Sequence, residues 1–363
     1  MEQANFKKLI SGQSSGLTAT ILRLLLYAAS EVYSTIIRIR NHLYSKGWLK
    51  THRTNAAVIS IGNITTGGTG KTPLVVWLCN QLTKNYKVAI LTRGYKSSAQ
   101  ESQNYRDEPA ILAESCPQAK VIVNPDRVAG AAEAINKFGA NVLIMDDGFQ
   151  HRRLGRDLDI IAIDATVPFG YDKMLPAGLL REPINSLKRA DAAVITRCDQ
   201  VTETELGQIE KNLGIINPDM LIAKSIHTPA YIKSENNKEI GLEQIKGKEI
   251  FAFCGIGNPE AFLNTIRQLG GKLLGSKVFN DHYHYTDNCL SDIYKRAEFL
   301  KVDLILTTQK DWTKIISDLG FRISDSESSI SLAYIGIEIE FLAGEDKLRD
   351  LIENALEGKI FRK

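Results

Sequence analysis

The sequence has 363 residues, of which 44% are hydrophobic and 24% are charged, and its formal net charge is +3. This length is enough for two domains of ordinary size, and the composition excludes a disordered or fibrous protein. The five cysteines include no C-x-x-C pair, so neither a disulfide framework nor a zinc site is indicated, and we expect a reducing cytoplasmic environment.

The first 54 residues are basic and contain a predicted amphipathic helix. They carry eight Lys or Arg side chains against two Glu, a local net charge of +6. Arg23 and Glu31, near the middle of the helix, argue against a membrane-spanning segment. Two interpretations stay open: a helix packed on a domain core, or a helix lying in the membrane interface. We favour the interface, because the basic flank that ends in Trp48 and Lys50 would attract anionic headgroups.

The helical periodicity of this segment runs from Leu17 to Ile39 and separates two kinds of residue. A polar stripe consists of Thr20, Arg23, Tyr27, Ser30, Glu31, Ser34 and Arg38. An apolar arc consists of Ile21, Leu22, Leu25, Leu26, Ala29, Val32, Tyr33 and Ile36.

A phosphate-binding loop is indicated at residues 58–73, VISIGNITTGGTGKTP. An apolar strand leads to a turn of small residues, and Lys-Thr-Pro then opens a helix, which is the order that such a loop needs. Glycines allow a close approach to phosphate oxygens, because a Cβ there would clash or forbid a positive φ. Lys71 supplies a mobile cation and Thr72 a hydroxyl for Mg²⁺. The predicted nucleotide-binding residues are Thr65, Thr66, Gly67, Gly68, Thr69, Gly70, Lys71 and Thr72.

One position departs from the usual pattern G-x-x-x-x-G-K-[ST] for such a loop. Thr65 stands where the pattern has its first glycine. The entry to the loop must therefore be built in another way.

Beyond this loop, strand-like and helical segments alternate, which predicts an α/β fold with a P-loop NTPase-like parallel sheet. The predicted helices are 72–82 and 128–138. The predicted strands are 87–91, 120–123, 141–145, 159–163, 192–195, 220–225, 249–253, 272–279, 303–306 and 332–337.

The segment 165–183 is unusually long for an irregular stretch, so it is either a functional loop or the crossing into a second domain. We expect three parts: a basic amphipathic membrane-interface helix (1–54), a phosphate-loop domain (55–170) and a second α/β domain (171–363) that closes the cleft.

Two carboxylates follow the apolar strand 141–145. A strand that ends in an acidic residue is how phosphate-loop proteins hold Mg²⁺, because neighbouring parallel strands end at the same edge of the sheet. Buried strands that end in Asp are common, but the position after a phosphate loop predicts a metal role here. Either Asp146 or Asp147 could be the direct ligand. Other polar residues also follow strands or lie in loops, where binding groups concentrate: Arg93, Asp107, Arg127, Gln150, Arg181, Glu182 and the cluster 281–285.

A rival interpretation comes from the segment 194–199, where a strand is followed by Thr-Arg-Cys-Asp. This sequence is similar to the guanine-reading [NT]-K-x-D motif of GTPases, with Arg in place of Lys. A membrane-associated P-loop GTPase or ATPase without a lipid acceptor is therefore the alternative function.

Motifs spread along the chain resemble one family. They are GNITTGGTGKTP, LTRGYKS, DEP, NPDR, DDGFQHRRLGRDLDI, LPAGLLREP, ITRCD, FCGIGNP and FNDHYHY. In this order they resemble the tetraacyldisaccharide 4'-kinase family of lipid A biosynthesis, and the match covers nearly the whole chain. In that family the first glycine of the phosphate loop is likewise replaced by Ser or Thr.

The resemblance implies a kinase that transfers the γ-phosphoryl group of ATP to the 4'-hydroxyl of a tetraacylated glucosamine disaccharide 1-phosphate, with Mg²⁺. It also implies a peripheral enzyme on the cytoplasmic face of the inner membrane, whose partners are the acylated disaccharide and the membrane surface. We expect no nucleic-acid partner and no obligate protein partner.

The resemblance further implies roles for individual residues. Lys71 belongs to the catalytic set, and Asp107 is the base, assisted by His282. Which of His282 and His284 is the functional histidine stays open. Near the substrate and the nucleotide, the resemblance places Arg127, Gln150 and Glu182.

Overall fold

A computed structural model describes residues 3–94, 107–234, 239–256, 259–280, 283–319 and 330–360 of the chain. The chain divides into two compact units. Unit 1 comprises Met1–Arg93, Cys116–His227 and Ile339–Lys363, and unit 2 comprises Gly94–Ser115 and Thr228–Glu338.

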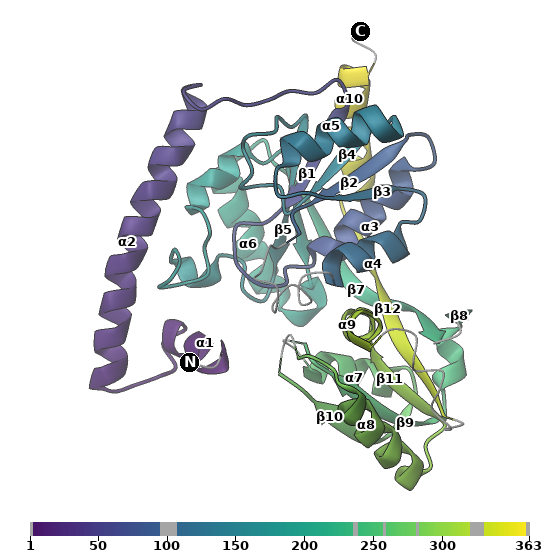
Figure 1. The fold of residues 1–363 in the computed structure, drawn as a ribbon. Coiled ribbons are helices and arrows are strands. Elements are labelled where there is room, and N and C mark those ends of the chain that lie inside the picture. Colours follow the sequence, from purple (N-terminus) through teal and green to yellow (C-terminus); the bar gives the residue numbers. More distant parts are fainter. Residues whose placement is uncertain are drawn as a thin grey trace. The chain divides into compact units, whose positions relative to one another are not determined.

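Unit 1 is built on a parallel sheet with β1 (Ala57–Gly62) near its centre (Figure 1). The strand order is β7-β6-β5-β1-β4-β2-β3, and every neighbouring pair is parallel. All six residues of β1 are buried, as expected for a strand that is covered on both faces. The other strands of this sheet are β2 (Val88–Thr92), β3 (Lys120–Val123), β4 (Val142–Asp146), β5 (Leu158–Asp164), β6 (Ala192–Thr196) and β7 (Leu221–Ser234).

The helices of unit 1 cover this sheet with apolar side chains. Helix α5 (Arg127–Phe138) packs Ala131 and Ala134 against Leu143 and Met145 of β4. Helix α6 (Glu203–Ile216) packs into a second cluster with residues of β5 and β6. Helices α3 (Lys71–Leu82) and α10 (Glu345–Ile360) also contact β1. Because the carboxyl ends of parallel strands meet at one edge, the segments that follow β1, β4 and β6 come close together.

Helix α2 (Leu17–Ser45) packs on unit 1 through small polar residues of its predicted polar stripe, and a short helix, α1 (Gln3–Ile10), precedes it. The buried residues of α2 are Ser30, Ser34 and Ile37. The Oγ of Ser30 donates a hydrogen bond to the carbonyl of Met174 at 2.9 Å. Ile37 also joins the apolar cluster of unit 1, and Tyr33 packs against that cluster. No residue of the predicted apolar arc is fully buried.

The opposite side of α2 presents large apolar side chains to solvent. These are Leu17, Ile21, Leu24, Leu25, Val32, Ile36 and Ile39, which are between 50% and 77% exposed. Leu22 and Leu26 of the predicted apolar arc are only half-exposed, so the arc is rotated from its predicted position. In the described part of the chain, α2 is the one helix whose length and composition would allow it to cross a membrane, with a mean hydropathy of 1.3 over its most apolar window.

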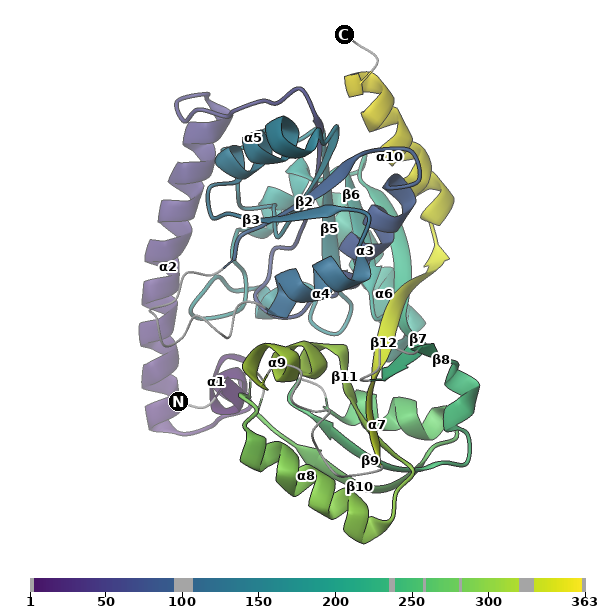
Figure 2. The same cartoon turned by 45° about the vertical axis from the view of Figure 1, so that its right-hand side comes forward.

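In unit 2, four parallel strands are neighbours in the order β10-β9-β11-β12 (Figure 2). Its strands are β9 (Glu249–Cys254), β10 (Lys272–Val278), β11 (Leu304–Thr308) and β12 (Ser331–Ala343), and the short β8 (Glu239–Ile240) pairs antiparallel with β7. Helices α7 (Pro259–Gln268) and α8 (Asp287–Leu300) pack into separate apolar clusters with these strands. Helix α4 (Asp107–Ser115) contacts α9 (Gln309–Leu319).

The fold is α/β, as the sequence predicts, and most of the predicted strands lie within two residues of the observed ones. Two strands extend further than predicted, because β7 and β12 each run from one unit into the other. The division into units also differs from the predicted boundary at residue 170. Unit 1 continues to His227, because β5, β6 and β7 are neighbours in one sheet. The irregular segment 165–183 lies inside unit 1 and is therefore a loop of that unit.

Candidate active site at the phosphate loop

The phosphate loop comprises residues 63–70, between β1 and α3. Gly67, with φ 111°, and Gly70, with φ 80°, adopt conformations that a side chain would strain. Gly68 does not have a positive φ, and a Cβ there would meet open space, so the predicted need for glycine holds at two of three positions. Among the described residues, no side chain caps the N-terminus of α3. The N–H groups of its first turn are therefore available to an anion.

The entry to the loop is built by the irregular segment 165–183, which answers the question raised by Thr65. The backbone N–H of Thr66 donates to the carbonyl of Leu179 at 2.8 Å, and that of Arg181 donates to Ile64 at 2.7 Å. Thr65 itself forms a β-bridge with Leu180 and is buried. Backbone pairing with a distant loop thus replaces the glycine turn of the usual pattern.

Lys71 and Arg181 both contact the carboxylate of Asp147. The Lys71 Nζ lies 3.4 Å from Asp147 Oδ1, and the Arg181 Nη1 lies 2.7 Å from the same oxygen. Burial would raise the pKa of Asp147, but the charges of Lys71 and Arg181 outweigh burial and lower it to about 2. Asp147 is also held in a left-handed conformation, with φ 51°. An ionised carboxylate that follows β4 therefore faces two cations beside the phosphate loop.

Asp146 occupies a different environment at the end of β4. Its Oδ2 accepts a hydrogen bond from the Thr92 hydroxyl at 3.2 Å, and its carbonyl accepts one from Arg127 Nη2 at 3.1 Å. Arg127 also donates to the carbonyl of Asn124 at 2.9 Å and is only 3% exposed. The structure thus places Arg127 against the end of β4, where it fixes backbone carbonyls.

Gln150 supports the start of the phosphate loop. Its Nε2 donates to the carbonyl of Asn63 at 2.8 Å. The Asn63 side chain in turn donates to Thr69 Oγ1 at 2.9 Å, which joins the two ends of the loop, and it accepts from Arg181 Nη1 at 3.2 Å. Asn63 is absent from the predicted site residues, although its position directly after a buried strand is a signal that could have identified it.

Glu182 is fully buried and belongs to a separate cluster that holds α2. Its carboxylate pairs with Arg40 and Arg189, each at 3.0 Å, and accepts a hydrogen bond from Asn41 at 2.7 Å. Burial alone would raise the pKa of Glu182, but Arg189 and these hydrogen bonds hold the pKa below its usual value. Arg40 and Asn41 lie on α2, and Arg189 ends a short 3-10 helix, Ile184–Arg189. The partners of Glu182 are therefore outside the phosphate loop.

The predicted base and its histidine are only partly described. Asp107 begins α4, in unit 2, and His282 lies outside the described residues. His284 is described and exposed. The assignment of Asp107 and His282 stays a prediction.

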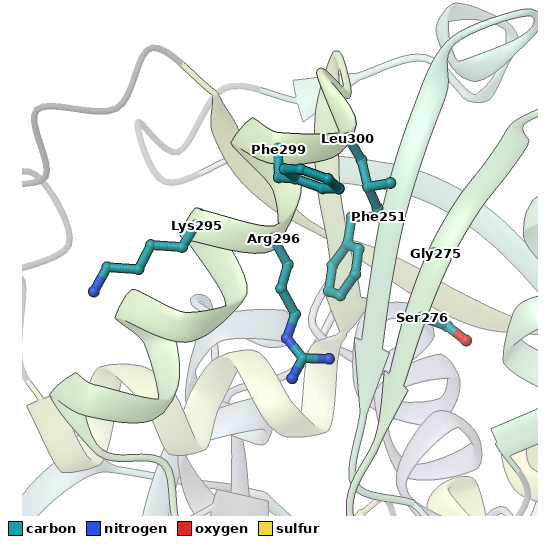
Figure 3. Close-up of a pocket in the computed structure, with 7 residues that line it drawn as sticks. All are labelled: Phe251, Gly275, Ser276, Lys295, Arg296, Phe299 and Leu300. Carbon is teal, nitrogen blue, oxygen red and sulfur yellow. The ribbon is translucent and has the colours of Figure 1, made fainter.

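A hollow of about 380 Å³ occurs on unit 2 (Figure 3). It lies beside α8 and β10, and the side chains of Phe299 and Arg296 lie on its α8 side. Its lining residues are Phe251, Gly275, Ser276, Lys295, Arg296, Phe299 and Leu300. Of the predicted site residues that the structure describes, none lines this hollow, so the phosphate loop stays the candidate site.

Comparisons with known proteins show which family the chain resembles. A family profile described as "Tetraacyldisaccharide-1-P 4'-kinase" matches residues 22–357. The chain is similar to tetraacyldisaccharide 4'-kinases from Chlorobaculum parvum, with 35% identity over 93% of this chain and 96% of the relative, and Halothermothrix orenii, with 32% identity over 88% and 89%. A crystal structure of LpxK from Aquifex aeolicus in complex with ATP is similar with a TM-score of 0.70 and 30% identity, covering 92% of this chain and 99% of that one.

Proposed function

The chain belongs to the tetraacyldisaccharide 4'-kinase family, and from this premise we propose how its residues carry out the reaction. The protein is an ATP-dependent kinase that phosphorylates the 4'-hydroxyl of tetraacyldisaccharide 1-phosphate, a lipid A precursor. The observation that carries the assignment is the match over most of the chain, with Lys71 at the N-terminus of α3 where a phosphate loop needs its cation. The alternative of a GTPase without a lipid acceptor is set aside, because no part of this match supports it.

We propose that the phosphate loop and Lys71 hold the β- and γ-phosphates of ATP. Phosphoryl transfer asks a protein mainly for positioning and for stabilisation of charge, since the transition state spreads negative charge over the phosphoryl oxygens. Gly67, Thr69 and Gly70 contribute loop N–H groups, and Lys71 supplies the cation. On ATP binding, Lys71 would exchange Asp147 for phosphate, while Arg181 keeps Asp147 ionised.

The donor set also fits Mg²⁺. Among the described residues, no group of three or more His, Cys, Asp or Glu side chains could hold a metal ion. Mg²⁺ in kinases needs no such group, because one or two carboxylates and the substrate phosphates suffice. Thr72, Asp146 and Asp147 would hold the ion, and Asp147 suits this role because its pKa of about 2 keeps it ionised. When bound, Mg²⁺ would neutralise charge on the phosphates.

We propose that Asp107 removes the proton from the 4'-hydroxyl and that His282 assists it. A sugar hydroxyl is a weak nucleophile, so a carboxylate within hydrogen-bond distance is expected to accept its proton during transfer. An imidazole beside this carboxylate could orient it and tune its basicity.

The remaining predicted residues would act through their neighbours. Arg127 supports the backbone of Asp146, and Gln150 supports the backbone of Asn63. We propose that Arg127 holds the metal-binding carboxylate in position and that Gln150 holds the start of the phosphate loop in position. Glu182 would hold α2 in place through Arg40 and Arg189.

We propose that α2 lies in the interface on the cytoplasmic face of the inner membrane. Its exposed side is apolar along the length of the helix, and its buried side is bonded to unit 1 through Ser30, Tyr33, Arg40 and Asn41. A spanning helix would be surrounded by lipid, which these bonds to the domain argue against. Four acyl chains leave a bilayer for water only at high cost, so the enzyme is expected to approach its substrate at the membrane.

The direct test is an assay of the purified protein with ATP, Mg²⁺ and a tetraacylated disaccharide 1-phosphate in detergent. We expect a product with a second phosphate group, detected by mass spectrometry, and none with GTP in place of ATP at equal concentration. Hydrolysis of nucleotide without phosphorylation of the lipid would contradict the proposal.

A further inference from the structure

Two residues at the carboxyl end of β6 contact the phosphate loop from outside. The hydroxyl of Thr196 donates to the carbonyl of Thr69 at 3.0 Å. The Nη2 of Arg197 donates to the carbonyl of Gly68 at 2.7 Å. The second terminal nitrogen of Arg197, Nη1, forms an ion pair with the carboxylate of Asp164 at the end of β5. Two consecutive carbonyl groups of the loop are therefore held by side chains of the neighbouring strands.

The burial and backbone conformation of these residues indicate that the surrounding structure maintains the contacts. Thr196 is fully buried. Arg197 adopts φ 57° and ψ 38°, a left-handed conformation that costs free energy for a residue with a Cβ. Such strain persists where the surrounding structure holds it in place. Here the pairing with Asp164 and the bond to Gly68 hold the side chain.

His227 closes the same side of the loop. A Cβ added to Gly70 would lie 2.6 Å from Cε1 and 2.7 Å from Nε2 of His227, so the imidazole packs directly on the loop backbone. Burial and the nearby Arg197 lower the pKa of His227 to about 4, so the ring is neutral at pH 7. The loop backbone at Gly70 is thus confined by a ring that adds no charge.

Because the peptide bond is planar, these contacts to carbonyl groups also affect the N–H groups that bind phosphate. In a trans peptide, the carbonyl of one residue and the N–H of the next lie in one plane and point in opposite directions. Fixing the carbonyls of Gly68 and Thr69 therefore also fixes the directions of the N–H groups of Thr69 and Gly70. These N–H groups therefore point away from the side chains of Thr196 and Arg197. Backbone N–H groups of such loops are the donors that bind phosphate oxygens.

We propose that Thr196 and Arg197, with Asp164 orienting the guanidinium, are positioning residues that preset the N–H groups of Thr69 and Gly70 for ATP. This inference rests on the proposed nucleotide site and assigns a task to the segment Thr-Arg-Cys-Asp. The sequence alone suggests that this segment could read a guanine base, but the structure commits Arg197 to the loop backbone and to Asp164.

The experiment compares Thr196→Val, which removes the hydroxyl, with Thr196→Ser, which keeps it. Binding of ATP to the full-length protein is measured by titration calorimetry without the lipid, and KM and kcat are measured with it. We expect Thr196→Val and Arg197→Ala each to raise the Kd for ATP on the order of tenfold, since a lost hydrogen bond to a preorganised loop has about this effect. Thr196→Ser should stay near the wild-type Kd, and KM for the lipid should not change.

Ser225→Ala is the matched control. The Ser225 hydroxyl is buried and donates to the carbonyl of Ile195 at 3.1 Å, so its removal also costs one buried hydrogen bond in the same sheet, outside the loop. We expect Ser225→Ala to lower Tm about as much as Thr196→Val and to leave the Kd for ATP unchanged.

Normal ATP affinity in Thr196→Val and Arg197→Ala would overturn the inference, and so would an equal loss of affinity in Ser225→Ala. Thr196→Val decides the question even if Arg197→Ala does not fold. Because binding is measured without the lipid, failure of the kinase assay in the wild-type protein would be a separate result that concerns the proposed acceptor.

Discussion

Lys71 and Asp147 form an ion pair at the phosphate loop, with Nζ 3.4 Å from Oδ1. Both side chains are expected to bind other partners in the reaction, Lys71 the phosphates and Asp147 the metal ion. In the proposed mechanism, their pairing compensates each charge until ATP and Mg²⁺ bind. The proposal therefore makes this exchange of partners part of nucleotide binding.

The first prediction concerns the cation. Lys71→Ala removes the cation that stabilises the negative charge on the γ-phosphoryl group in the transition state. The kcat should therefore fall on the order of a hundredfold or more. Tm should change little, because Asp147 retains its ion pair with Arg181 at 2.7 Å. Lys84→Ala, at an exposed position after the same helix, is the control and should leave kcat unaltered. A variant at position 71 with normal turnover would assign Lys71 a structural role only.

The second prediction concerns acid stability. The pKa of Asp147 is lowered from 3.8 to about 2 in the folded protein, so its contribution to the free energy of unfolding is present above pH 3.8 and is lost as the pH falls toward 2. A shift of this size corresponds to about 2 kcal/mol at neutral pH. The difference in free energy of unfolding between the wild type and Asp147→Asn should therefore shrink between pH 4 and pH 2, as measured by urea denaturation. A constant difference across this range would show that Lys71 and Arg181 do not set the pKa.

The third prediction concerns α2. Leu25 and Ile36 are 63% and 57% exposed, so changing both to Ser should weaken binding to anionic phospholipid vesicles on the order of tenfold or more and leave Tm unchanged. Ile37→Ser tests the opposite side of the helix, where Ile37 is 8% exposed, and should lower stability by about 2 kcal/mol or more. Vesicle co-sedimentation and thermal melts distinguish the two effects. Unaltered vesicle binding by the double variant would argue that α2 does not face lipid.

The fourth prediction concerns Glu182. Removing this buried carboxylate in Glu182→Ala leaves Arg40 and Arg189 without their partner, which should cost about 3 kcal/mol and loosen α2. Limited proteolysis should then cleave α2 faster, while the Kd for ATP stays near the wild-type value. If Glu182 contacted the nucleotide instead, the Kd would rise and proteolysis of α2 would not change.

The fifth prediction concerns the proposed base. If Asp107 and His282 act together on the sugar hydroxyl, each Ala variant should lower kcat far more than it raises KM for ATP. The double variant should lose less than the product of the two single losses, because residues that act as a unit are not additive. The acidic limb of the pH profile should disappear in Asp107→Ala, since that limb reports deprotonation of the base. Fully additive losses, or a limb that persists, would assign proton removal to another group.

The elements of the fold could be predicted because their signals are local. The apolar run 142–145, for example, is buried in the sheet. The phosphate loop was evident from the order of glycines, Lys71 and Thr72. In contrast, the entry to the loop depends on the pairing of Thr66 with Leu179, which lie far apart in the sequence. No local pattern encodes such a contact.

The orientation of α2 shows a second limit of sequence patterns. Periodicity separates the polar and apolar sides of the helix only approximately, and it does not say which side contacts the protein. Hydrophobic burial would favour the apolar side, yet two of the three buried residues are Ser30 and Ser34, and Ser30 donates a hydrogen bond to the carbonyl of Met174. This choice becomes reasonable only when the apolar side has another apolar partner, such as lipid.

Arg181 and Glu182 are neighbours in the chain, and their side chains have different partners. Arg181 binds Asp147 at the phosphate loop, while Glu182 binds Arg40 on α2. One peptide unit therefore links the reacting centre to the helix, with no flexible tether between them. If α2 lies on the bilayer as proposed, the height of the phosphate loop above the lipid surface is set by the protein itself. The enzyme would then select acceptors by how far their sugar hydroxyl projects from the membrane, and a lipid with a longer or shorter headgroup would present its hydroxyl at the wrong level.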